Sequence, residues 1–224
     1  MDKLFQLLID SFWPMFKAGL LISVPLMLIS FLLGLILAFV VALMRMSKWK
    51  PLRAVAWFYV WVIRGTPLIV QIFVIFFGLP NVGIVLDPIP AAILALTLSQ
   101  GGYNSEVIRA ALGSIPKGQF EACKALGMTR LQTMVSVVIP QAALVAVPAL
   151  ANSFISLLKD TSLVATITVP EIFQTAKQIN AVKMQTLPLY LEAAFVYLIF
   201  STVLTRLQGL LEKKLGKHLV DTRV

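Results

Sequence analysis

Long hydrophobic runs separated by short polar stretches dominate this chain. A membrane-spanning helix needs roughly 20 mostly apolar residues, because about 30 Å of hydrocarbon is crossed at about 1.5 Å per residue. The clearest run, 18–44, contains no ionisable side chain and lies too far from any small-residue cleavage pattern to be a signal peptide. Four further runs also qualify. We therefore expect about five spanning helices, over 18–44, 55–79, 89–112, 140–158 and 187–211.

The composition agrees with a chain that lives in a bilayer. Of its 224 residues, 59% are hydrophobic and only 13% are charged, which departs from ordinary globular usage. No low-complexity tract or soluble domain interrupts the runs. We expect one all-α membrane domain over 1–224.

The distribution of cations predicts the orientation, because cytoplasmic loops carry the excess of Lys and Arg. Cations cluster after the first, third and fifth runs, whereas the loop GLPNVGIVLDPIP after the second run has none. The segment 159–183 is mixed, because Asp160 and Glu171 only partly offset its lysines. We expect the N-terminus outside, the C-terminus in the cytoplasm and 116–140 inside. The cations concerned are Arg45, Lys48, Lys50, Arg53, Arg109, Lys117, Lys124, Arg130, Arg206, Lys213, Lys214, Lys217 and Arg223.

The net charge of +9 does not indicate nucleic-acid binding. The cations lie in juxtamembrane loops, where anionic lipid headgroups and topology account for them. The single cysteine, Cys123, excludes an intramolecular disulfide and a thiolate metal cluster.

A polar stretch, EACKALGMTRLQTMVSVVIP, separates the third and fourth runs. Ser114 and Pro116 predict the start of a short helix and Gly127 predicts its end. Phe120 and Cys123 fall on one face of that helix. Amphipathicity alone leaves open a helix that rests on lipid headgroups.

The spacing of this stretch resembles the EAA signature of ATP-binding-cassette importer permeases. In that signature Glu-Ala-Ala is followed after three residues by Gly, and after nine more by Ile-any-Leu-Pro. Here Glu121, Ala122 and Cys123 precede Gly127, and the sequence VVIP ends at Pro140. The resemblance implies a coupling segment, about 114–140, whose helix docks in a cleft of a separate cytoplasmic ATPase. Small residues and a turn-forming glycine suit such a contact.

Further stretches resemble the polar amino acid permeases of the histidine and glutamine type, with the closest likeness to L-cystine permeases. They are IRGTPLIVQIF, LDPIP, NSFISLLKDTSL and VPEIFQTAKQI. The resemblance implies a type I, MetI-like fold in a bacterial inner membrane and an extracellular or periplasmic substrate-binding protein as partner. The chain has no G-x-x-x-x-G-K-[ST] loop, so we expect no cofactor here and assign ATP and Mg to an ATPase dimer.

Polar side chains within hydrophobic runs mark shielded cavities, because they are costly in hydrocarbon. An amino acid zwitterion needs acceptors for its ammonium and a cation or donors for its carboxylate, which Lys159 and Asp160 offer together. These two residues equally fit an ion pair or a helix cap, and Glu106 fits a pair with Arg109. The candidate path residues are Gln71, Tyr103, Glu106, Asn152, Ser156, Lys159, Asp160, Thr161 and Ser162.

Three other features carry local expectations. Gly101 and Gly102 predict close helix packing. Arg64 is expected to reach the interface beside an aromatic belt of Trp57, Tyr59 and Trp61. The segment 161–169 is too short to span and can re-enter the bilayer only where protein shields it.

Five helices scarcely enclose a path for an amino acid, so we expect a second permease subunit. A homodimer is favoured over a heterodimer because twofold pairing is the commonest assembly. An intramembrane enzyme is disfavoured: His218 stands alone and no H-E-x-x-H or G-x-S-x-G motif occurs, although Ser156 and Lys159 have the spacing of a Ser-Lys pair. A self-contained channel or ion-coupled transporter leaves the EAA spacing unexplained.

Overall fold

The computed structural model describes residues 2–220, and within that range all regular structure is helical. Arg223, one of the cations used for the orientation, lies outside the described residues. In chain order the elements are α1 (Asp2–Ala18), η1 (Gly19–Ser23), α2 (Val24–Met46), α3 (Lys50–Gly65), α4 (Leu68–Phe73), η2 (Val74–Gly78), η3 (Leu79–Val82), α5 (Pro88–Gly113), α6 (Lys117–Ala125), α7 (Arg130–Thr133), η4 (Met134–Val138), α8 (Ile139–Asp160), η5 (Thr161–Ile167), α9 (Ile172–Lys183) and α10 (Thr186–Val220).

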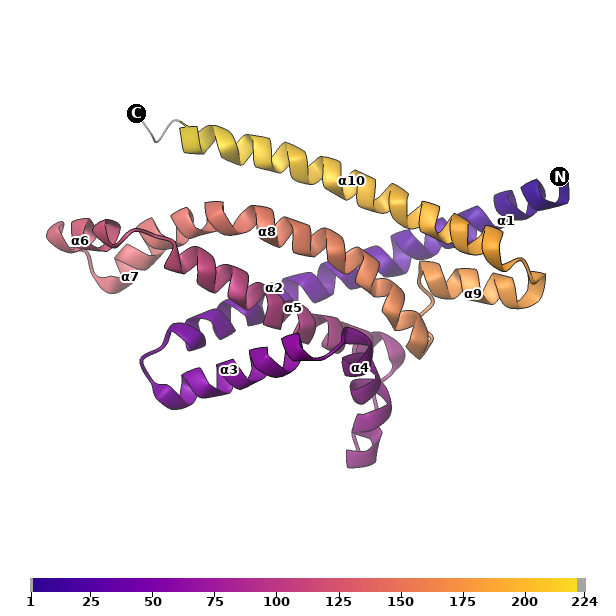
Figure 1. Ribbon diagram of the computed structural model, residues 1–224, viewed down its shortest axis with the longest axis horizontal. Coiled ribbons are helices and arrows are strands. Elements are labelled where there is room, and N and C mark those ends of the chain that lie inside the picture. Colours follow the sequence, from indigo (N-terminus) through magenta and orange to yellow (C-terminus); the bar gives the residue numbers. More distant parts are fainter. Residues whose placement is uncertain (1, 221–224) are drawn as a thin grey trace.

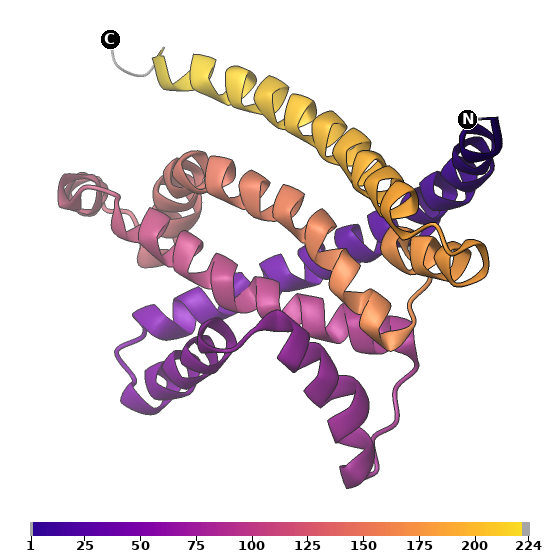
Figure 2. The same cartoon turned by 45° about the vertical axis from the view of Figure 1, so that its right-hand side comes forward.

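The long helices run roughly along one axis and give the molecule two ends (Figure 1). One end, here called the α6 end, holds α6, α7, the turn between α2 and α3, and the C-terminal part of α10. The opposite end, the α9 end, holds α9, the N-terminus and the start of α10. In the view turned by 45° (Figure 2), α8 and α10 again run between these ends.

Three continuous helices among the described residues are long and apolar enough to cross a membrane: Leu4–Met46, Arg130–Ile167 and Thr186–Leu210. The expected all-α membrane fold is confirmed, but two helix boundaries differ from the prediction. The first helix begins well before residue 18, and the fourth begins at Arg130 instead of Pro140. Helix α5 has the length of a span, 26 residues, but polar side chains in its second half lower its apolar character.

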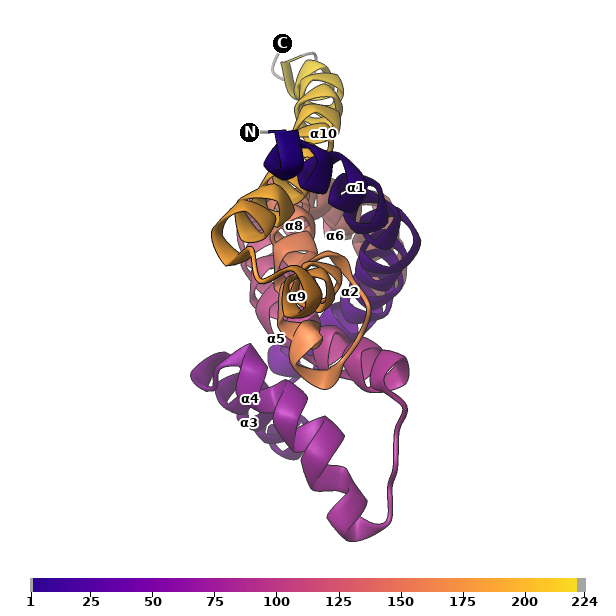
Figure 3. The ribbon, with the colours of Figure 1, turned by 90° about the vertical axis from the view of Figure 1, so that its right-hand side faces the viewer.

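The second expected span, 55–79, is not one straight helix. Lys50–Gly65 and Leu68–Val82 meet at a bend of 108°. Pro67 explains the break: it forces Thr66 into an extended conformation, with φ −121° and ψ 145°, and brings no N–H to continue the helix. The segment after the bend projects away from the other helices in the view along the long axis (Figure 3).

Helix α5 is the central element, and it packs most extensively against α2, with further contacts to α8 and α3. The predicted close packing at the glycine pair is confirmed. A Cβ on Gly101 would lie 2.6 Å from Leu37 Cδ2, and one on Gly102 would lie 2.6 Å from Ile63 Cγ2. Only glycine lets α2 and α3 approach α5 so closely.

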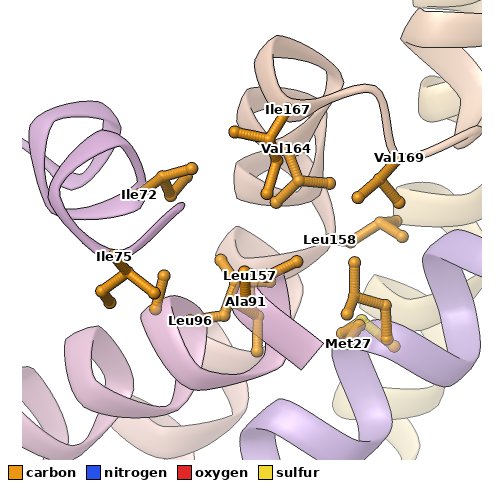
Figure 4. Close-up of a cluster of buried hydrophobic side chains, with 13 residues drawn as sticks. Met27, Ile72, Ile75, Ala91, Leu96, Leu157, Leu158, Val164, Ile167 and Val169 are labelled. Atoms are coloured by element: carbon orange, nitrogen blue, oxygen red, sulfur yellow. The ribbon is translucent and has the colours of Figure 1, made fainter. Parts of the chain in front are cut away.

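The largest hydrophobic cluster joins segments far apart in the chain (Figure 4). Met27 of α2, Ile72 of α4 and Leu96 of α5 meet Leu157 of α8 and Ile167 of η5, all nearly or fully buried. The apolar side of the segment 161–169 is therefore shielded by protein, whereas Thr166 and Thr168 are exposed.

Candidate functional site

A short helix, α6, lies at the α6 end beyond the hydrophobic core of the bundle (Figure 1). It covers Lys117–Ala125, and Cys123 is its only buried residue. Its N-cap is Pro116, which makes no side-chain cap. The expected role of Ser114 at this helix start is wrong, because its hydroxyl donates to the carbonyl of Ala111 at the end of α5, at 2.8 Å.

The end of α6 depends on Gly127. The Met128 N–H donates to the Cys123 carbonyl and the Gly127 N–H to the Lys124 carbonyl, each at 3.0 Å. This is a Schellman motif, which requires a left-handed residue at the position of Gly127. Its φ is +72°, and a Cβ there would meet nothing within 4 Å. The glycine is therefore needed for backbone conformation and not for space, as the sequence predicted for a sharp turn.

A new helix starts immediately after this turn. Thr129 forms a capping box with Gln132: the Gln132 N–H donates to Thr129 Oγ1 at 3.2 Å, and the Thr129 N–H to Gln132 Oε1 at 2.8 Å. The helix then continues through the π-helical turn η4 into α8, so Pro140 lies inside a continuous helix. The stretch between the two long helices therefore covers 114–129, and the rest of the expected coupling segment, 130–140, belongs to the helix that contains α8.

The coupling segment presents both small and apolar groups to its surroundings. Glu121 and Ala122 are exposed, and Leu126 is 80% exposed. A hydrogen bond from Gln141 Nε2 to Gln119 Oε1, at 3.1 Å, links the segment to α8. A surface of this kind suits a macromolecular partner that covers the helix.

Part of the predicted substrate path forms a polar stripe on α8. Asn152, Ser156 and Lys159 are exposed and recur at the spacing of one helix face. Asn152 Oδ1 accepts a hydrogen bond from Gln208 Nε2 of α10 at 3.0 Å. The stripe lies near the α9 end of α8.

The neighbouring predicted residues at the end of α8 differ in their contacts. Thr161 Oγ1 donates to the Leu158 carbonyl and Ser162 Oγ to the Lys159 carbonyl, each at 2.7 Å. The ion pairs found among the described residues do not include Lys159 or Asp160. The pairing considered for these two residues is therefore not observed.

Tyr103 and Gln71 both lie beside the end of α3. The Arg64 guanidinium lies 5.7 Å from the centre of the Tyr103 ring. Gln71 Nε2 donates to the Ile63 carbonyl at 2.8 Å and to Thr66 Oγ1 at 3.0 Å, across the bend. The amide donor of Gln71 thus stabilises the break between α3 and α4.

The aromatic belt expected beside Arg64 is only partly present. Trp57 and Trp61 are exposed and stacked, with ring centres 5.9 Å apart. Tyr59 instead points inward and donates to the Leu98 carbonyl at 2.6 Å. The placement of Tyr59 in the belt was wrong, because a run of aromatic residues does not indicate which face of the helix packs against the rest of the protein.

Glu106 lies between two arginines. Arg109 Nη2 approaches its Oε2 at 2.8 Å, and Arg45 Nη2 approaches its Oε1 at 3.5 Å. The predicted pair within α5 is confirmed, and the second arginine extends it to the end of α2. The pair stabilises the α6 end of the bundle.

The chain is similar to a known family of transport proteins. Residues 30–217 match the family described as "Binding-protein-dependent transport system inner membrane component". The chain belongs to this family. It is thus a permease subunit of a transport system and not an enzyme.

Curated relatives cover almost the whole permease. It is 47% identical over 210 residues to the "L-cystine transport system permease protein TcyB" of Bacillus subtilis, covering 93% of this chain and 90% of the relative. It is 38% identical to the "Nopaline transport system permease protein NocM" of Agrobacterium fabrum, covering 96% and 92%. The resemblance to amino acid importer permeases drawn from the sequence is confirmed.

Solved structures agree with the fold. A chain from the "Crystal structure of an amino acid ABC transporter with histidines" matches with a TM-score of 0.85 and 34% identity, covering 92% of this permease and 96% of that chain. A chain of the "MetNI methionine ABC transporter" in inward-facing form matches with a TM-score of 0.69 and 19% identity, covering 96% and 99%. The expected MetI-like permease fold is confirmed.

The structure also joins polar residues that sequence reasoning did not connect. Gln100 Oε1 accepts from Asn104 Nδ2 at 3.1 Å and from Ser153 Oγ at 2.9 Å, which ties α5 to α8. Glu171 is fully buried, caps α9 through the Gln174 N–H at 2.7 Å and accepts from the Tyr197 hydroxyl. Glutamate is not among the usual N-cap residues, so the sequence carries no clear signal for this role of Glu171.

Proposed function

We propose that this permease is the membrane subunit of an ATP-driven amino acid importer and that its substrate is L-cystine. The substrate is supported by the identity of 47% to the L-cystine relative, against 38% to the nopaline relative. The observation that carries the ATP-driven mechanism is α6, a short helix outside the core that ends in a glycine turn.

The proposed partner at α6 is a separate ATPase dimer, which binds ATP and Mg. Exposed small and apolar groups at Ala122 and Leu126 allow a protein surface to approach the helix backbone closely. Because α6 is joined to α5 by a short turn and to α8 through the continuous helix from Arg130, movement of α6 is passed to two long helices. The residues proposed for this coupling are Glu121, Ala122 and Gly127 on the exposed side, Cys123 on the buried side of α6, and Pro140 in the next helix, which contains α8.

The proposed orientation places the α6 end in the cytoplasm. Cationic side chains cluster at this end, as expected for the cytoplasmic side of a membrane protein. Among the described residues they include Arg45, Lys50 and Arg53 near the turn after α2, and Lys117 and Lys124 on α6. The N-terminus and α9 then face outward, where a substrate-binding protein delivers the amino acid. The C-terminus faces the cytoplasm.

We propose a homodimer, with the substrate path beside the dimer interface. The exposed stripe of Asn152, Ser156 and Lys159 on α8 is the part of this chain best suited to line the path, because it offers a cation and neutral hydrogen-bonding groups. Tyr103 and Asp160 are further candidates. Alternating access follows if the two bundles rock against each other.

Reconstitution into vesicles tests this proposal. The permease is inserted alone, or together with its ATPase and binding protein, and uptake of labelled L-cystine and L-arginine is measured. We expect uptake of L-cystine only in the complete assembly with ATP. Uptake by the permease alone would refute the ATP-driven mechanism, whereas preference for L-arginine would refute only the proposed substrate.

A further inference from the structure

An apolar groove runs along the bundle between α2 and α8, over α5. It has a volume of about 420 Å³, and all of its lining side chains are hydrocarbon. Six of them define its length: Ile36, Val40, Ile108, Ile139, Ala143 and Leu150. Ile36 and Val40 on its rim are 65% and 47% exposed, so the groove faces the surroundings of the bundle.

Two further cavities adjoin the groove toward the α6 end. Val40 also lines a cavity of about 500 Å³ that includes Met44, Leu52 and Met134. Met134 in turn lines a third cavity, of about 480 Å³, which reaches Lys124 and Arg130. Neighbouring cavities thus share lining residues from the apolar groove to the cavity that contains Lys124 and Arg130.

The third cavity is positively charged. Lys124 of α6 and Arg130 of α7 both line it, together with the hydroxyl-bearing residue Thr133. In the part of the chain that the structure describes, every ion pair involves Glu106, so Lys124 and Arg130 form no ion pair with a described residue. The one acidic residue of the coupling segment, Glu121, is exposed and does not line the cavity.

We propose that the groove and the two adjoining cavities together bind one anionic phospholipid. Its phosphate lies between Lys124 and Arg130, and one acyl chain lies in the groove between α2 and α8. The two cations offset the negative charge of a phosphate, and their N–H groups and the Thr133 hydroxyl can donate hydrogen bonds to its oxygens. An apolar groove that leads from such a pocket into the hydrocarbon region suits an acyl chain and not a free anion.

The dimensions support this ligand. From Met134 to Leu150 the helix rises about 24 Å, at about 1.5 Å per residue. One leaflet of a bilayer is about 15 Å of hydrocarbon, half of the total thickness of about 30 Å. An acyl chain that starts at the Met134 level therefore ends within the groove.

The proposed lipid contacts both the coupling segment and the bundle. Lys124 belongs to α6, whereas the groove belongs to α2, α5 and α8. The lipid would hold α6 against the bundle at the membrane surface. This role does not depend on which amino acid is transported or on the ATPase contact.

Native mass spectrometry of the purified full-length chain tests the proposal, with phosphatidylglycerol and phosphatidylcholine titrated as probes. We expect one phosphatidylglycerol to bind in preference to phosphatidylcholine. Lys124→Gln or Arg130→Gln should each weaken this binding by about fivefold, the effect of one cation near a phosphate surface. Lys177→Gln, on α9 at the opposite end, is the matched control and should not change it.

A second pair of variants tests the groove. Ala143→Phe fills it from an exposed position and should abolish selective binding, whereas Ala149→Phe, exposed on the same helix but outside the groove, should not. Equal binding of the two lipids, or unchanged binding in Ala143→Phe, would overturn the proposal. Disulfide crosslinking between two copies of Ala143→Cys would also overturn it, since a second permease would then cover the groove.

Discussion

Two glycines of this permease act through different physical effects. Gly127 has a left-handed backbone and open space around its Cα, whereas Gly102 has an ordinary helical backbone and almost no space. At position 127 most side chains are excluded by backbone strain. At position 102 they are excluded by a clash with the Ile63 side chain. Substitutions at the two positions therefore have distinct consequences.

Gly127→Val should uncouple ATP hydrolysis from uptake in the assembled transporter. A β-branched residue in the left-handed region costs about 1 to 3 kcal/mol, so the turn after α6 will rearrange. The measurement is the number of substrate molecules taken up per ATP hydrolysed in vesicles.

Two control variants separate backbone strain from bulk. Gly127→Asn should keep most of the coupling, because asparagine tolerates this conformation. Gly118→Val adds the same bulk within α6, where a Cβ meets nothing within 4 Å, and should also transport. Wild-type coupling in Gly127→Val would count against the role of this turn.

Gly102→Ala should destabilise the bundle. The added Cβ would lie 2.6 Å from Ile63 Cγ2 and 3.0 Å from Ile63 Cβ, so α3 must move away from α5. Overpacking of this kind costs about 1 to 3 kcal/mol. Thermal unfolding in detergent should show a lower midpoint than for Gly113→Ala, a control on the same helix with open space. Equal midpoints would contradict the packing argument.

Helix α2 and helix α5 are joined at the α6 end by the carboxylate of Glu106. It contacts Arg109 on its own helix and Arg45 at the end of α2. Because its side chain is only 18% exposed, the interaction is weakly screened by solvent compared with a surface pair. Glu106 therefore acts here as a structural link between elements.

Glu106→Gln should lower the free energy of unfolding by about 1.5 to 3 kcal/mol, the range for hydrogen bonds to charged groups. The double variant with Arg45→Gln should be less destabilised than the sum of the two single variants, because both remove one interaction. Unfolding midpoints of the three variants in detergent provide the test. Strict additivity would mean that Arg45 and Glu106 do not interact.

The sequence predicted well those elements whose structure is determined by residues close together in the chain. The hydrophobic runs determined the long helices, Gly127 determined the end of α6, and the glycine pair in α5 determined close packing. The bend between α3 and α4 was missed because the run 55–79 stays hydrophobic across it, although Pro67 was a local signal. Contacts between distant segments, such as Gln100 with Ser153, have no signature in either segment alone.

The whole molecule has a cationic α6 end and a mixed α9 end, and this asymmetry predicts its topology. Lys183 at the end of α9 and Lys117 at the start of α6 are both exposed. A membrane-impermeant maleimide should label Lys183→Cys in intact cells and Lys117→Cys only after permeabilisation. The native Cys123 is buried and should give little background. Labelling of Lys117→Cys in intact cells would reverse the proposed orientation.

The central claim is that α6 lies against a separate ATPase during transport. A photocrosslinking amino acid at position 126, which is 80% exposed in the isolated chain, tests this contact most directly. In an active transporter we predict an adduct with the ATPase from position 126 and none from position 149 on α8. An assembly that imports its substrate while position 126 forms no adduct with any ATPase would contradict the account.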